Sequence, residues 1–149
     1  MSVAEMLNSL AQEVAEALEI PAPKVRVGKV SESAYRAWHI DDHCSHGELL
    51  ADDTIVIEPG DDPYDLALVV IHEITHLAVP CERPEGCLVY RSHTEDFFLT
   101  AATLYTAYAI PEEYALRRCQ RYEPQCVPTI TACYETLTEM GLFGCKTQQ

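Results

Sequence analysis

Apolar side chains recur every three or four residues near the start of the chain, with glutamate and glutamine between them. This spacing predicts an amphipathic helix over residues 3 to about 19, because positions three and four apart share one helix face. The apolar positions are Val3, Met6, Leu7, Leu10, Val14 and Leu18. The sequence PAP at 21–23 ends the helix, since proline lacks the backbone N–H that a helix interior needs.

Shorter, alternating segments follow. KVRVGKV at 24–30 alternates apolar and polar residues, which predicts a half-buried strand. AYRAWHI at 34–40 is a second strand candidate, and DDHCSHGE at 41–48 is typical of a loop. TIVIEPG at 54–60 predicts a third strand that its proline and glycine end.

The most apolar segment of the chain, DDPYDLALVVIHEITHLAV at 61–79, predicts a central helix. Asp62 is a good N-cap, and Pro63 suits the first helical position. Residues 66–71 are apolar on every side, so we expect the helix to be buried until Pro80 stops it.

Helices dominate the remaining residues. CERPEGC is expected to be a loop, and Thr94 is a candidate cap for the helix that follows it. The expected helices cover 94–110, 111–122 and 128–141, with Gly141 at the end of the last. The order of a helix, a small sheet and further helices predicts an α+β fold in a single domain, 1–149. Its parts are an N-terminal helix in 1–20, a core in 24–108 and C-terminal helices in 111–149.

Composition narrows the classes of function. A chain of 149 residues with 48% hydrophobic residues can bury a real core. Its formal net charge of −14, from 24 acidic and 10 basic residues, argues against binding to nucleic acid or anionic membranes. The first residues lack the positive region of a secretory signal, and no apolar run reaches the roughly 18 residues of a membrane span. We therefore expect a cytoplasmic protein.

Seven cysteines are many for such a chain, and none of them forms a CxxC pair. A zinc ribbon is therefore poorly supported. Small buried thiols are the favoured interpretation, and disulfides are the alternative.

The candidate chemistry lies in HEITH at 72–76. His72 and His76 are four residues apart, so on a helix they project from nearly the same face and can reach one zinc ion. Glu73 lies beside them, where it can act on the water that the metal activates without being a ligand itself. A buried His–Glu network without metal is the alternative.

A catalytic zinc usually has three protein ligands. RSHTEDFF at 91–98 offers His93, Glu95 and Asp96 at the expected start of the next helix. His93 is the preferred third ligand, because neutral imidazole suits zinc, and Glu95 is its rival. Val79 and Glu82 stand where a metzincin would have glycine and histidine, so that class is excluded.

Other candidates are weaker. A second metal site at His43, Cys44 and His46 is less favoured than ordinary loop composition, and His39 is expected to be structural. An oxyanion needs a donor besides zinc, and no spacing argument selects among the candidates. These are Tyr90, Tyr105 and Tyr108.

The motifs resemble those of SprT-like and related minimal gluzincin peptidases, the WLM and YgjP-type proteins among them. That pattern is an HExxH helix, a variable loop, and then a histidine followed by an aromatic residue. In this chain the histidine is His93, and Phe97 and Phe98 follow it. The resemblance covers about residues 24–108. It implies a small, mostly antiparallel sheet packed on the HExxH helix, with Zn²⁺ held by His72, His76 and His93.

By the same resemblance, Glu73 would activate water for peptide-bond hydrolysis. Trp38, Cys44 and Gly47 precede TIVIEP, which resembles the family's edge strand, a strand that would hold a peptide substrate by backbone pairing. A similarity to ImmA/IrrE-type peptidases would favour Glu95 instead of His93.

The chain also departs from this family. It lacks the accessory zinc ribbon, residues 111–149 match no part of the pattern, and WHIDDHC replaces the usual Trp-Gly-Ser-Cys stretch. Two functions therefore stay open. One is a zinc-dependent peptidase acting on a peptide or protein substrate, and the other is a catalytically silent, zinc-stabilised binding module of the same fold. The oligomeric state is not predicted.

Overall fold

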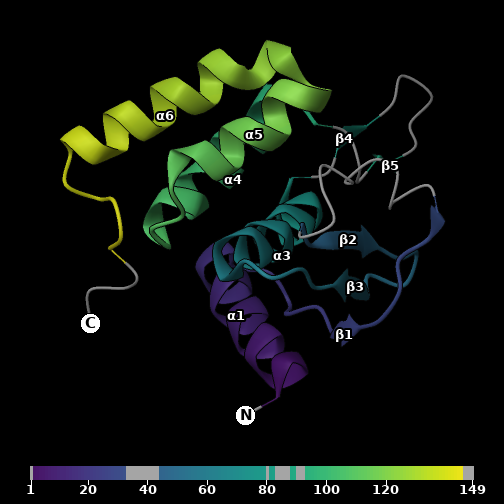
Figure 1. Ribbon diagram of the computed structural model, residues 1–149. Coiled ribbons are helices and arrows are strands. Elements are labelled where there is room, and N and C mark those ends of the chain that lie inside the picture. Colours follow the sequence, from purple (N-terminus) through teal and green to yellow (C-terminus); the bar gives the residue numbers. More distant parts are fainter. Residues whose placement is uncertain (1, 33–43, 80, 83–87, 90–92, 146–149) are drawn as a thin grey trace. The chain divides into compact units, whose positions relative to one another are not determined.

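The protein is described from a computed structural model, which covers residues 2–32, 44–79, 81–82, 88–89 and 93–145. Its contacts divide the chain into two compact units, residues 1–78 and 79–149. Across the described residues there are five α-helices, a three-stranded mixed sheet and a separate two-stranded sheet. The predicted α+β class is confirmed (Figure 1).

The first unit begins with α1 (Val3–Leu18), as the apolar spacing predicted. The Ser2 hydroxyl caps this helix by accepting a hydrogen bond from the backbone N–H of Glu5, at 3.1 Å. Glu19 then adopts a left-handed conformation, with φ of 58°, and ends the helix before the prolines. Buried Ala11 and Val14 form part of the face that packs against the rest of the unit.

Asn8 fastens α1 to the sheet. Its side-chain amide donates to the carbonyl of Val25 at 2.9 Å, and its side-chain oxygen accepts from the N–H of Val25, also at 2.9 Å. A second donated bond, to the carbonyl of Ala4 at 2.8 Å, holds the amide on its own helix. The amide of Asn8 therefore satisfies both backbone groups of one strand residue, as a neighbouring strand would.

The sheet consists of β1 (Val25–Val27), β2 (His46–Leu49) and β3 (Ile55–Glu58), in the order β1-β3-β2. β1 is parallel to β3 and β2 is antiparallel to it, so the expected mostly antiparallel sheet is a mixed one.

Two further expectations about the sheet are wrong. The stretch 41–48 was expected to be a loop, but its last residues belong to β2. The TIVIEP strand, expected at an edge, is the central strand of the described sheet. The reason is that Ile55, Val56 and Ile57 are all buried, so β3 is apolar on both faces and suits a central position. The strand expected at 34–40 lies outside the described residues.

The central helix of the unit is α3 (Pro63–Ala78), close to the predicted range. Asp62 caps it, because its side-chain oxygen accepts from the N–H of Tyr64 at 2.9 Å. Every residue from Leu68 to His76 is buried. α3 packs against α1 and also against β2 and β3, so both sides of this apolar helix are covered (Figure 1).

A buried carboxylate ties the start of β2 to α3. Asp65, in the first turn of α3, accepts a hydrogen bond of 2.7 Å from the backbone N–H of Ser45. The hydroxyl of Ser45 accepts in turn from the N–H of Gly60, at 2.9 Å. These bonds position β2 beside the helix that carries HEITH.

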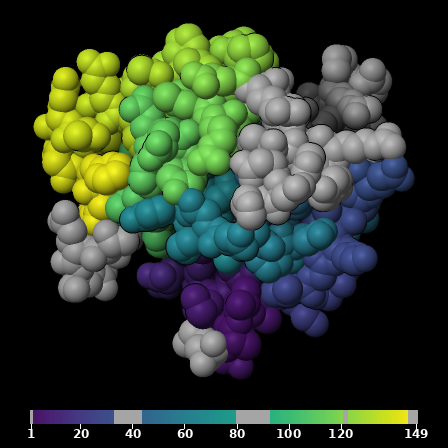
Figure 2. All heavy atoms as spheres, in the orientation of Figure 1, coloured from purple at the N-terminus to yellow at the C-terminus, as the bar shows by residue number. Residues whose placement is uncertain are grey.

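The second unit is built mainly from α4 (Glu95–Ala107), α5 (Glu112–Tyr122) and α6 (Val127–Glu139), all three near their predicted ranges. A short 3₁₀ helix, η1 (Pro124–Cys126), joins α5 to α6, and α6 packs against both α4 and α5. The hydroxyl of Tyr134 donates to the carbonyl of Ile110 at 2.8 Å and fixes α6 on the end of α4. Figure 2 shows α6 in yellow on the surface, where its Glu135 and Glu139 are exposed.

The connections in this unit agree only in part with expectation. The residues expected to form a loop at 81–87 include β4 (Cys81–Glu82), which pairs antiparallel with β5 (Leu88–Val89). Gly141, with φ of 75°, follows the end of α6, where the glycine was predicted to lie. Among the described helices, none combines the length and the apolar character needed to cross a membrane.

The described cysteines agree with the buried-thiol interpretation only in part. Cys44, Cys119 and Cys126 are buried, but Cys145 is exposed. Cys119, Cys126, Cys133 and Cys145 form no disulfide. Cys87 lies outside the described residues.

We predict that Asn8→Ala lowers the free energy of unfolding by about 1–3 kcal/mol, because it leaves two backbone groups of buried Val25 without their partner. Asn8→Asp should be destabilising as well, since a carboxylate cannot donate to the two carbonyls. Urea unfolding followed by circular dichroism measures both changes. Gln12→Ala, on the same helix one turn later and exposed, is the control. Equal stability of Asn8→Ala and Gln12→Ala would contradict the proposed role of Asn8.

Candidate metal centre

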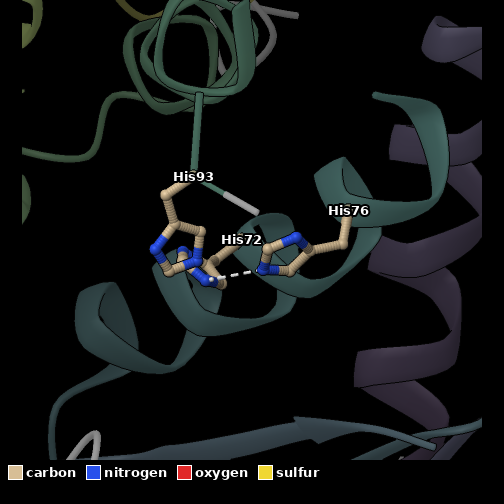
Figure 3. A group of neighbouring side chains, drawn as sticks. All are labelled: His72, His76 and His93. Carbon is tan, nitrogen blue, oxygen red and sulfur yellow. Dashed lines mark hydrogen bonds between the residues drawn. The ribbon is translucent and has the colours of Figure 1, made fainter. Parts of the chain in front are cut away.

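HEITH lies within α3, and its three ionisable residues are buried. The exposed fractions of His72, Glu73 and His76 are 5%, 4% and 3%, which is unusually low for ionisable side chains. The two imidazoles face each other from consecutive turns, with 3.2 Å between their Nε2 atoms (Figure 3). The prediction that both rings project from one face of the helix is confirmed.

The separation of these two nitrogens fits a shared metal ion. Two Zn–N bonds of about 2.0–2.1 Å at a tetrahedral angle place the nitrogens about 3.3 Å apart. The observed 3.2 Å is within about 0.1–0.2 Å of that value. Without an ion, the same distance suits one N–H···N hydrogen bond between neutral rings. The separation therefore fits either a hydrogen bond between the two rings or one cation bound by both.

Gly47 on β2 shapes the wall beside Glu73. A Cβ atom at this glycine would lie 2.4 Å from Cγ1 of Val69, 3.2 Å from Cδ1 of Ile57 and 3.3 Å from Cγ of Glu73. The first distance is shorter than carbon atoms tolerate, so only glycine allows β2 to approach α3 this closely. Glu73 is consequently held between the helix and the strand.

His93 belongs to the second unit and lies directly before Thr94, the residue that precedes α4. Thr94 is the N-cap of that helix, as predicted, because its hydroxyl accepts from the N–H of Phe97 at 3.2 Å. The His93 ring packs on the rings of Phe97 and Phe98, with centroid distances of 4.9 Å and 5.7 Å. Its Nδ1 contacts the side-chain oxygen Oε1 of Glu123.

One ligand atom from each of His72, His76 and His93 can be chosen so that all three lie within 4.8 Å of one another. Three histidines are therefore close enough to bind a metal ion. Within the described part of the chain, this group includes neither Glu95 nor Asp96, which are exposed in the first turn of α4.

The structure covers the second metal site and the candidate oxyanion donors only in part. His43, His39 and Tyr90 lie outside the described residues, so the second metal site suggested with Cys44 and His46 is not tested. Tyr105, one of the candidate oxyanion donors, is buried within α4.

Two contacts near the candidate ligands were not predicted from the sequence. The resemblance named Gly47, but not its contact with Glu73. Gly47 was placed in a loop, and its proximity to Glu73 depends on strand pairing that HGEL does not signal. Glu123 was not singled out, because 30 residues separate it from His93 and the contact follows from the packing of the C-terminal helices. No local pattern could have identified Glu123.

Comparisons of the chain with protein-family models, with curated proteins and with solved structures found no match.

We predict that Gly47→Ala destabilises the first unit by about 1–3 kcal/mol, because the added methyl group forces Val69 and α3 away from the sheet. Thermal or urea unfolding measures the change. The double variant Gly47→Ala/Val69→Ala removes the clashing methyl group, and it should be less destabilised than the sum of the two single variants. Strict additivity of the two substitutions would contradict the close approach.

Proposed function

We propose that this chain is a zinc-dependent peptidase of the SprT-like, minimal gluzincin type. In this proposal His72, His76 and His93 bind the metal and Glu73 is the general base. The observation that carries the proposal is the pair of buried imidazole nitrogens 3.2 Å apart on the helix that also buries Glu73.

The donor set favours zinc among the metals of proteins. Neutral imidazole nitrogens suit Zn²⁺, and three of them leave a fourth tetrahedral position open for water or substrate. Imidazole also binds copper, iron and nickel, so the identity of the metal is part of the proposal. Calcium and magnesium, which prefer oxygen ligands, fit the three histidines poorly.

The proposed reaction is hydrolysis of a peptide bond. Bound zinc would polarise the scissile carbonyl and make water acidic enough to attack it near neutral pH. Glu73 would accept a proton from the attacking water and deliver it to the nitrogen of the leaving amine. The water oxygen bonds to the carbonyl carbon and the C–N bond breaks. Both protons of the water end on the leaving nitrogen, so the products are a carboxylate and a protonated amine.

The substrate in this proposal is a peptide or protein. The net charge of −14 gives no support for a nucleic-acid partner. The cytoplasmic location stays a prediction. The alternative of a zinc-stabilised binding module without turnover differs from the peptidase only in the role of Glu73, so an experiment on that residue separates the two.

We predict about one zinc ion per chain in protein purified with excess zinc and then desalted, measured by inductively coupled plasma mass spectrometry. His72→Ala, His76→Ala and His93→Ala should each lose most of this zinc, because each removes a ligand. Glu95→Ala, two residues after His93 in the first turn of α4, is the control and should keep it. Full retention of zinc in the three histidine variants would overturn the ligand set, and loss in Glu95→Ala would point to the rival ligand.

We predict that Glu73→Gln keeps the zinc but slows cleavage of a fluorogenic peptide library by about 10²–10⁴-fold, because the amide cannot take the proton. Glu95→Gln removes the same charge from the surface and should cleave at the parent rate. Equal cleavage by Glu73→Gln and the parent would refute the general-base role. Zinc binding in the parent without cleavage of any library member would support the binding module instead.

A further inference from the structure

We propose that Glu123 is a positioning residue for the metal ligand His93: its carboxylate accepts a hydrogen bond from Nδ1–H and thereby presents Nε2 to the metal. This inference rests on the proposed function, in which His93 is a ligand. It assigns a role at the metal centre to the C-terminal helices, which lie outside the part of the chain that resembles the peptidase family.

The contact joins Nδ1 of His93 to Oε1 of Glu123, and both residues belong to the second unit. Their side chains are 24% and 23% exposed, so the pair is largely shielded from water. A carboxylate accepts hydrogen bonds but cannot donate them when ionised, so the shared proton lies on Nδ1. In that tautomer Nε2 carries the lone pair that a metal requires.

The backbone around Glu123 is held by three hydrogen bonds. Its N–H donates to the carbonyl of Cys119 at 2.8 Å. Its carbonyl accepts from the N–H of Cys126 at 2.9 Å and from the thiol of Cys119 at 3.1 Å. Burial raises the pKa of the Cys119 thiol to about 12, so this thiol keeps its proton and its role as donor at neutral pH. The carboxylate of Glu123 therefore extends from a fixed point at the junction of α5 and η1.

The imidazole is also restrained on its own side. Phe97 packs against the His93 ring with an interplanar angle of 33°, and Phe98 meets it edge-on at 67°. The Thr94 cap fixes the chain directly after His93. Packing thus limits rotation of the ring, while the Glu123 carboxylate selects which nitrogen carries the proton.

A carboxylate bonded to the outer nitrogen of a ligating histidine also makes that ligand more basic. Replacement of such partners in zinc proteins typically weakens metal binding by about 10–100-fold. We therefore expect Glu123→Gln and Glu123→Ala to raise the zinc dissociation constant by at least about tenfold, as measured by competition with a chromophoric chelator. Glu113→Gln, on the exposed side of α5, removes the same charge and should change the constant less than about twofold.

A double-mutant cycle separates this inference from the proposed function. If Glu123 acts through His93, zinc should bind His93→Ala and His93→Ala/Glu123→Gln equally weakly. A normal dissociation constant for His93→Ala would overturn both the ligand assignment and the role of Glu123. A weakened His93→Ala together with an unchanged Glu123→Gln and Glu123→Ala would overturn the positioning role alone.

Nuclear magnetic resonance of the metal-free protein gives a second readout, independent of zinc and of activity. Two-bond ¹⁵N–¹H correlations of the His93 ring at pH 8 should show the Nδ1–H tautomer in the parent and in Glu113→Gln. Glu123→Ala should shift the proton toward Nε2, which a purely structural role for Glu123 would not do. An Nε2–H tautomer in the parent would overturn the proposal. If Glu123→Ala does not fold, Glu123→Gln and the parent tautomer still decide the question.

Discussion

The structure depends on keeping two imidazoles and a carboxylate inside the most apolar helix of the chain. Polar groups are costly to bury without partners. The stability of α3 therefore requires that the polar atoms of His72, Glu73 and His76 form hydrogen bonds or bind a metal ion. Bringing two Nε2 atoms to 3.2 Å is one solution, because a shared proton or a shared cation satisfies both of these atoms. Other contacts in the first unit hold the elements that cover this helix in place. Asn8 anchors the covering helix α1 to the sheet, and Asp65 and Gly47 fix β2 against α3.

The candidate ligands in the two units are oriented by different interactions. In the first unit, helical geometry alone orients the pair of histidines, since side chains four residues apart share a face. In the second unit, His93 precedes its helix and has no such repeat to orient it. Its direction comes from the aromatic rings of Phe97 and Phe98 and from the carboxylate of Glu123. A histidine that lies outside a helix or strand therefore needs tertiary contacts to fix the direction of its ring.

The same contrast explains what the sequence could predict. The helices α1, α3 and α4 were predicted because their apolar spacing is a local signal. The caps of α3 and α4 were predicted for the same reason, from Asp62 before Pro63 and from Thr94. The shared helix face of the two HEITH histidines was also predicted from a local signal, their spacing of four residues. The strand β2 was missed because HGEL has few strand-forming residues and its Gly47 is required by an approach to α3 that only the fold reveals. The central position of β3 was missed because an edge strand was inferred from a resemblance and not from its two apolar faces.

The hydrogen bonds around Glu123 also give a physical role to one of the buried cysteines. A buried thiol is a small apolar group with one weak proton to donate, and Cys119 donates that proton to the carbonyl of Glu123. Deprotonation would remove this donor, yet burial raises the pKa of the thiol far enough that the donor persists through the neutral range. A disulfide to this sulfur would remove the donor as well. The reduced state of Cys119 is thus the state in which the backbone that carries the Glu123 carboxylate is held by all three of its hydrogen bonds.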